Sequence, residues 1–108
     1  MKLFGERIRS EREEKQLPLR KVAAYLDIDT SILSKIERGE RKPTVDLIYK
    51  IADFFNLNGD NLLEEFLSED IAFTLYQEKN SEKILKVAEE KVAYLKTINQ
   101  KQGKINFK

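Results

Sequence analysis

The sequence predicts an all-α protein: a five-helix bundle followed by additional C-terminal helices. Apolar residues recur every three or four positions along most of the chain, which is the spacing of a buried helix face. Turn-forming residues, such as Pro18, Gly39, Pro43 and Gly59, separate these periodic stretches. With 108 residues, of which 41% are hydrophobic, the chain can build one compact core.

The composition excludes several classes of function. The chain has no Cys and no His, which excludes disulfides, zinc fingers and histidine acid–base catalysis. Its carboxylates are scattered over charged helices and no Gly-rich phosphate loop is present, so we expect neither an enzyme nor a bound cofactor or metal. There are 20 basic and 19 acidic residues, so a basic surface must come from local arrangement.

The N-terminus and the hydropathy of the chain predict its location. The first residues, MKLFGERIRSERE, turn charged at once and have no apolar signal-peptide core. No apolar run reaches 18 residues, the length of a membrane-spanning helix. We therefore expect a cytoplasmic protein without membrane contact.

The first predicted helix covers about residues 3–16 and is charged, with a narrow apolar stripe. It ends before Pro18, because a residue that precedes proline avoids helical geometry. Proline is accepted in a first helical turn, so Pro18 also helps to start the next helix.

Residues 19–38 predict two short helices joined by a tight turn, with one polar face left free. Their shared core positions are Val22, Ala23, Leu26, Ile28, Leu33 and Ile36. We expect the Asp29 side chain to cap the second helix and Gly39 to end it in a left-handed conformation. The free face makes this stretch a plausible DNA-reading element.

The next loop, GERKPT, leads to a third strongly periodic helix that ends at about Phe55. Thr44 is placed to cap it, and its predicted buried face begins at Val45. After the turn NLNGDN, a short helix that includes Leu62 and Leu67 completes a first domain, residues 1–67.

Residues 68–108 predict a C-terminal dimerisation or extension region. A short helix begins at Ser68, a longer one runs from about Ser81 to Gln102, and the tail from Gly103 is expected to fray. The long helix carries a heptad-like apolar stripe, formed by Ile84, Leu85, Ala88, Val92, Leu95 and Ile98. This stripe either folds back on its own chain or pairs with a second copy. We favour dimerisation, because the first domain already closes its own core.

Residues 4–67 closely resemble the helix-turn-helix domains of the Cro and phage-repressor (XRE) family. The resemblance rests on the combination of Val22-Ala23, the run SKIERGERKP at 34–43 and the helix end IADFFNL at 51–57. It implies a repressor-like five-helix bundle that binds double-stranded operator DNA, usually as a homodimer, and regulates transcription.

The resemblance also implies roles for individual residues. It makes residues 19–26 the positioning helix and residues 30–38 the recognition helix in the major groove. The predicted base contacts are Thr30, Ser31, Ile32, Ser34 and Lys35, and Ile32 is equally compatible with packing on the positioning helix. The predicted phosphate contacts are Arg38, Arg41, Lys42 and Thr44. Arg12 and Glu37 are expected to form a structural ion pair.

Two positions depart from the family pattern. Leu19 stands where many members place a Gln that contacts DNA, and Asp27 replaces a common turn glycine. Asp visits the left-handed region more readily than most residues, so the fold prediction survives. The operator sequence, however, cannot be taken from relatives.

The sequence therefore predicts a repressor or autoregulator that binds an inverted repeat as a homodimer. An antitoxin or a restriction-modification controller is the alternative among DNA-binding proteins. From another class, a protein-interaction adaptor would bind a protein partner through its C-terminal helices and bind DNA weakly. Phe73, Tyr76 and Tyr94 also suggest a small-ligand pocket, although aromatic residues there are more often core.

Overall fold

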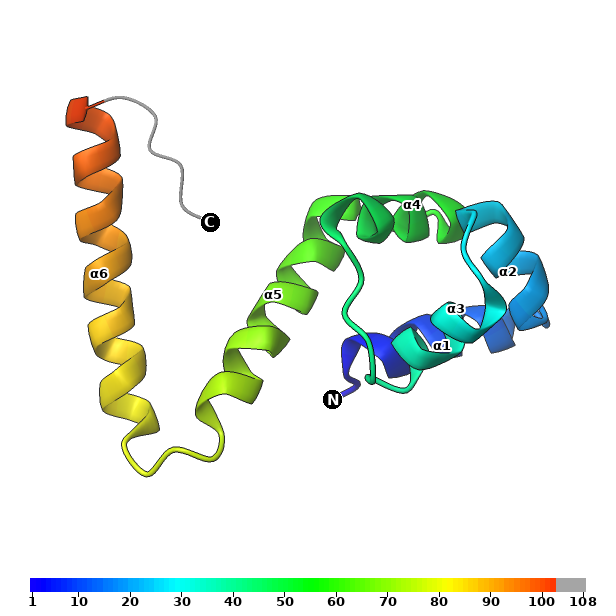
Figure 1. The fold of residues 1–108 in the computed structure, drawn as a ribbon, viewed down its shortest axis with the longest axis horizontal. Coiled ribbons are helices and arrows are strands. Elements are labelled where there is room, and N and C mark those ends of the chain that lie inside the picture. Colours follow the sequence, from blue (N-terminus) through cyan, green and yellow to red (C-terminus); the bar gives the residue numbers. More distant parts are fainter. Residues whose placement is uncertain (103–108) are drawn as a thin grey trace. The chain divides into compact units, whose positions relative to one another are not determined.

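The computed structural model describes residues 1–102, with side chains to residue 100, and within this part the chain forms six α-helices and no strand (Figure 1). The helices are α1 Phe4–Glu14, α2 Leu19–Leu26, α3 Thr30–Glu37, α4 Val45–Phe55, α5 Gly59–Leu75 and α6 Ser81–Gln102. The all-α prediction is confirmed. The predicted fraying from Gly103 onward lies outside the described residues.

The chain divides into two compact units, Met1–Asp70 and a second unit that begins at Ile71. In the first unit, α1 to α4 and the start of α5 surround one apolar core (Figure 1). Its buried residues are Phe4, Ile8, Val22, Ala23, Leu26, Leu33, Ile36, Ile48, Ile51, Ala52, Phe55 and Leu62. The helical spacing of apolar residues therefore identified most of this core.

The ends of α2 to α4 show which predicted caps form. Asp27 follows α2 at φ 57° and Gly39 follows α3 at φ 75°, so both predicted left-handed positions are confirmed. The Thr44 side chain accepts a hydrogen bond from the Leu47 amide at 3.2 Å, as predicted. The predicted Asp29 side-chain cap is wrong, because Asp29 caps α3 only through its backbone carbonyl, which accepts from Ile32 and Leu33.

Three further expectations are corrected. Ser68 does not start a new helix, because its hydroxyl donates to the Glu65 carbonyl within the continuous helix α5. Val45, in the first turn of α4, and Leu67, on α5, are exposed rather than part of the core. Phe73, Tyr76 and Tyr94 are exposed as well, so they are not core aromatic residues.

The first half of α5 is attached to α1 within the first unit. The Phe4 amide donates to the Glu69 carboxylate at 2.6 Å, and Arg7 forms an ion pair with Glu65. The Phe4 ring also meets the Phe66 ring edge to face, with 5.3 Å between centroids. These contacts explain how α5 closes the core of the first unit.

Helix α6 in the second unit keeps its apolar stripe exposed. Of the predicted dimerisation residues, Ile98 is half-buried and the others are exposed, among them Leu85, Val92 and Leu95. Within the described residues, no helix is both long enough and apolar enough to span a membrane.

Candidate nucleic-acid interface

Helix α3, the predicted recognition helix, is braced from its inner side by an ion pair. The Arg12 guanidinium on α1 donates to both Glu37 carboxylate oxygens, from Nε at 2.8 Å and from Nη2 at 3.0 Å. The two side chains are only 12% and 5% exposed. This contact raises the pKa of Arg12 above its ordinary value, because the Glu37 hydrogen bond favours the charged guanidinium.

The same guanidinium extends the brace to the linker before α2. Arg12 Nη1 donates to the Leu17 carbonyl at 2.9 Å. One side chain therefore joins α1, the linker and the end of α3. A bidentate Arg–carboxylate pair has defined geometry, so it fixes the orientation of the recognition helix as well as its position.

A close approach of α1 to α3 adds to this restraint. A Cβ atom placed on Gly5 would lie 2.5 Å from the carbonyl oxygens of both Ile36 and Glu37. Only glycine fits at that separation. The N-terminal turn of α1 and the C-terminal turn of α3 therefore meet backbone to backbone.

The outer side of α3 presents the predicted base-contact residues with unequal exposure. Thr30, Ser31 and Lys35 are exposed, whereas Ser34 is half-buried. Ile32 is also half-buried and packs against the core, which agrees with the alternative that it packs inside the domain rather than contacting a base. Of the predicted base contacts, Thr30, Ser31 and Lys35 therefore have the most accessible side chains.

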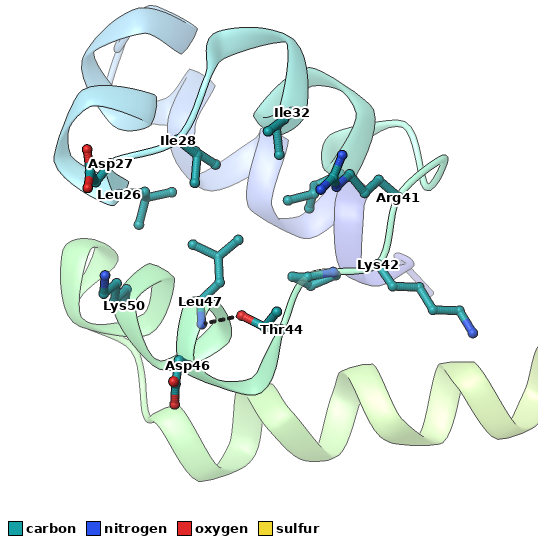
Figure 2. A pocket seen from close by; sticks show the side chains of 12 residues that line it. Leu26, Asp27, Ile28, Ile32, Arg41, Lys42, Thr44, Asp46, Leu47 and Lys50 are labelled. Carbon is teal, nitrogen blue, oxygen red and sulfur yellow. Dashed lines mark hydrogen bonds between the residues drawn. The ribbon is translucent and has the colours of Figure 1, made fainter. Parts of the chain in front are cut away.

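A groove with a volume of about 280 Å³ lies between the α2–α3 turn, α3 and the start of α4 (Figure 2). Its apolar wall includes Ile28, Ile32 and Leu47, and Arg41 and Lys42 lie at its rim. Figure 2 shows the Arg41 side chain turned toward the groove and Lys42 extended away from it.

Lys50 on α4 also lines this groove and was not identified from the sequence. It lies six positions after Thr44, on a helix whose sequence drew attention only to its apolar face. Its position on the exposed side of the helical pattern could have identified it as a surface cation. The groove carries both signs of charge, because Asp27 and Asp46 line it together with Arg41, Lys42 and Lys50.

Two of the predicted phosphate contacts are paired with carboxylates in the structure. Arg38 Nε donates to Glu40 at 2.7 Å, and this hydrogen bond lowers the pKa of Glu40 and raises that of Arg38. Lys42 lies 2.6 Å from the Asp70 carboxylate. Neither Glu40 nor Asp70 was identified from the sequence, because neither contact follows a helical spacing.

A helix-turn-helix family model matches residues 8–62, which include α2, α3 and all of α4. The chain belongs to the XRE-type helix-turn-helix family. The resemblance found in the sequence is thereby confirmed. The family and the relatives below are DNA-binding transcriptional regulators rather than enzymes.

Two curated relatives of this XRE-family chain are HTH-type transcriptional regulators. YazB of Bacillus subtilis is 40% identical over 60 residues, which cover 56% of this chain and 87% of YazB. DdrOP3 of Deinococcus deserti is 32% identical over 74 residues, which cover 67% of this chain and 57% of DdrOP3. This chain is accordingly a transcriptional regulator with a helix-turn-helix domain.

Two solved structures share the fold. The clp gene regulator ClgR from Corynebacterium glutamicum matches with a TM-score of 0.52 and 20% identity, over 94% of this chain and 92% of that one. A chain of the SinR protein/SinI protein complex matches with a TM-score of 0.52 and 21% identity, over 94% of this chain and all of that one. At this identity, the likeness supports the repressor-like fold alone.

Proposed function

We propose that this XRE-family regulator is a repressor or autoregulator that binds an inverted-repeat operator as a homodimer. The observation that carries the proposal is the outer face of α3, where Thr30, Ser31 and Lys35 are exposed while the inner face is braced by Arg12 and Glu37. Short hydroxyl groups and a lysine can donate hydrogen bonds to base edges in the major groove. Because the Arg12–Glu37 ion pair holds α3 in place, these side chains can meet bases in one defined geometry, which favours sequence-specific binding.

Phosphate contacts would set the position of α3 on the duplex. Arg41 and Lys42 come from the α3–α4 loop, and α4 begins directly after Thr44, so its N-terminal backbone amides would lie near the same phosphates. Such contacts carry little sequence information, but they fix the register of the recognition helix. We therefore assign base reading to the start of α3 and backbone positioning to the loop.

Homodimer formation would come from α6. Its apolar stripe repeats at heptad-like spacing and is exposed in the single chain, and a helix of 22 residues gains little stability in water without packing. Two copies related by a two-fold axis would read half-sites about 34 Å apart. Sedimentation that shows only monomer at micromolar concentration would contradict this assignment.

A gel-shift assay with the DNA upstream of its own gene tests the proposed function. We expect a specific shift that Lys35→Ala weakens, since this substitution removes a base-edge donor worth about 1–3 kcal/mol of discrimination. Lys96→Ala, at an exposed lysine on α6, is the matched control and should leave the shift unchanged. Equal shifts for that DNA and for unrelated DNA would contradict the proposal.

A protein-interaction adaptor is the second candidate, and the exposed stripe of α6 favours it. One structural neighbour is a chain from a complex of the SinR protein with a second protein, SinI. An adaptor of this kind would use α6 for a different protein and bind DNA weakly. The gel-shift assay separates the two candidates, because an adaptor would not bind the upstream DNA more tightly than unrelated DNA.

The antitoxin and restriction-modification alternatives remain predictions, and neighbouring genes would distinguish them. The cytoplasmic location also remains a prediction, which follows from the DNA that this regulator would bind.

A further inference from the structure

Arg38, at the C-terminal end of α3, is held by two side chains of its own segment. Its Nη1 donates to the Ser34 hydroxyl, while Nε and Nη2 donate to the two Glu40 carboxylate oxygens at 2.7 and 3.3 Å. The carboxylate therefore occupies one whole edge of the guanidinium. A phosphate that used this edge would have to replace Glu40.

The backbone conformation places Glu40 next to Arg38. Gly39 takes φ 75°, and the Glu40 amide then donates to the Lys35 carbonyl at 2.8 Å. This cap holds Glu40 directly after the recognition helix, next to Arg38 and in the electrostatic field of Lys35. A negative charge at a helix C-terminus is unfavourable toward the helix dipole, so helix stability does not explain a glutamate there.

Carboxylate and phosphate compete for the same donors on arginine. Both accept paired, charge-assisted N–H···O bonds from a guanidinium edge. Arg38 and Glu40 are about half exposed, at 49% and 56%, so a phosphate can reach the pair. Exchange of the carboxylate for a phosphate is favourable only when the phosphate arrives at hydrogen-bonding distance and in the right orientation.

We propose that Glu40 is a specificity-determining residue, which keeps Arg38 from contributing to binding until a phosphate is held in register beside it. This inference rests on the proposed DNA-binding function. On an operator, base contacts made by Thr30, Ser31 and Lys35 hold the duplex in one register, and the same phosphate always meets Arg38. On unrelated DNA the register varies, Arg38 stays on Glu40, and the non-specific complex loses one phosphate contact.

The test uses the full chain with Glu40→Gln, which keeps the size of the side chain and removes its charge. Binding to an operator selected from random DNA and to a duplex of unrelated sequence is measured over a range of salt. On unrelated DNA, the salt slope of the variant should steepen by about one phosphate contact, or about 0.9 in log–log units. Its advantage over the wild-type protein should then grow about threefold between roughly 200 and 50 mM salt.

Operator binding should change less, because Arg38 already contacts a phosphate there. The loss in the ratio of operator affinity to unrelated-DNA affinity caused by Glu40→Gln should therefore be about threefold larger at roughly 50 mM than at roughly 200 mM salt. Glu64→Gln, at an exposed position on α5, makes the same change of charge and should leave the ratio and both slopes unchanged.

A double variant shows whether Glu40 acts through Arg38. In an Arg38→Ala background, Glu40→Gln should no longer steepen the slope on unrelated DNA. A slope that still steepens would mean a general charge effect and would overturn the inference.

The remaining outcomes separate the inference from the function on which it rests. If the wild-type protein prefers the operator and Glu40→Gln leaves the affinity ratio unchanged, the inference is wrong and the proposed function stands. If the wild-type protein selects no operator from random DNA, the proposed function fails and the inference fails with it.

Discussion

The two units of this chain treat their apolar side chains in opposite ways. Residues 1–70 bury twelve apolar side chains around one core. In the second unit, most large apolar side chains stay exposed, such as Phe73 at 54% and Val92 at 50%. The first unit therefore has a core of its own, while the second presents an exposed apolar surface.

This difference suggests a separate role for each unit. The first unit holds the braced helix α3, to which we assign base reading, on the same core that buries its inner face. The second unit supplies an exposed apolar stripe, which suits assembly. The following substitutions test this division, beginning with the largest expected effect.

Loss of the Arg12–Glu37 ion pair should lower the stability of the first unit more than any other substitution below. Glu37→Ala leaves the Arg12 guanidinium almost buried without its carboxylate, which should lower the free energy of unfolding by about 3 kcal/mol or more. Urea unfolding followed by circular dichroism measures the change. Glu13→Ala is the control, because its ion pair with Arg9 is more than half exposed and should matter little. An unchanged free energy of unfolding in Glu37→Ala would contradict the brace.

Two valines compare the units directly. Val22 is fully buried in the first unit, whereas Val92 is 50% exposed on α6. Val22→Ala should lower the free energy of unfolding by about 1.5–3 kcal/mol, since it removes two buried methyl groups and leaves a cavity. Val92→Ala should change it by less than about 0.5 kcal/mol in dilute monomer, yet weaken self-association in sedimentation. Equal losses of unfolding free energy in Val22→Ala and Val92→Ala would contradict the difference between the two units.

Gly5→Ala tests how closely α1 and α3 approach. Helix propensity alone favours Ala over Gly by about 1 kcal/mol. The added Cβ would collide with two backbone carbonyls of α3, and such overpacking typically costs about 1–3 kcal/mol. We expect a net loss of stability in thermal unfolding. A gain in melting temperature would mean that the two helices separate easily.

The smallest expected effect concerns the phosphate contacts. Replacing Arg41 and Lys42 together by Ala should weaken binding to all DNA sequences and flatten the salt dependence by about two units. Lys91→Ala with Lys96→Ala removes the same charge from the exposed surface of α6 and should leave the slope unchanged. Equal slopes for the two double variants would rule out phosphate contacts by Arg41 and Lys42.

The sequence predicted most of the first unit, because its signals are local. Apolar spacing, Thr44 and the left-handed positions Asp27 and Gly39 each depend on a few neighbouring residues. It failed at Asp29, where the backbone caps the helix without the side chain, and at Ser68, whose hydroxyl bonds within α5.

The candidate interface was less predictable, since its electrostatics depend on contacts outside the helical pattern. Arg38 pairs with Glu40, two positions later in the chain, and Lys42 pairs with Asp70, which lies on the distant helix α5. Motif positions predict which cations contact phosphates. They give no information on which carboxylates hold those cations in the free protein.

Selection of DNA bound by the full chain from a random pool tests the central claim most directly. If α3 reads bases and α6 joins two copies, the selected sequences will contain two half-sites in inverted orientation, about one helical turn (~34 Å) apart. A pool with no enriched sequence would contradict DNA reading by α3, and a single unrepeated half-site would contradict assembly through α6.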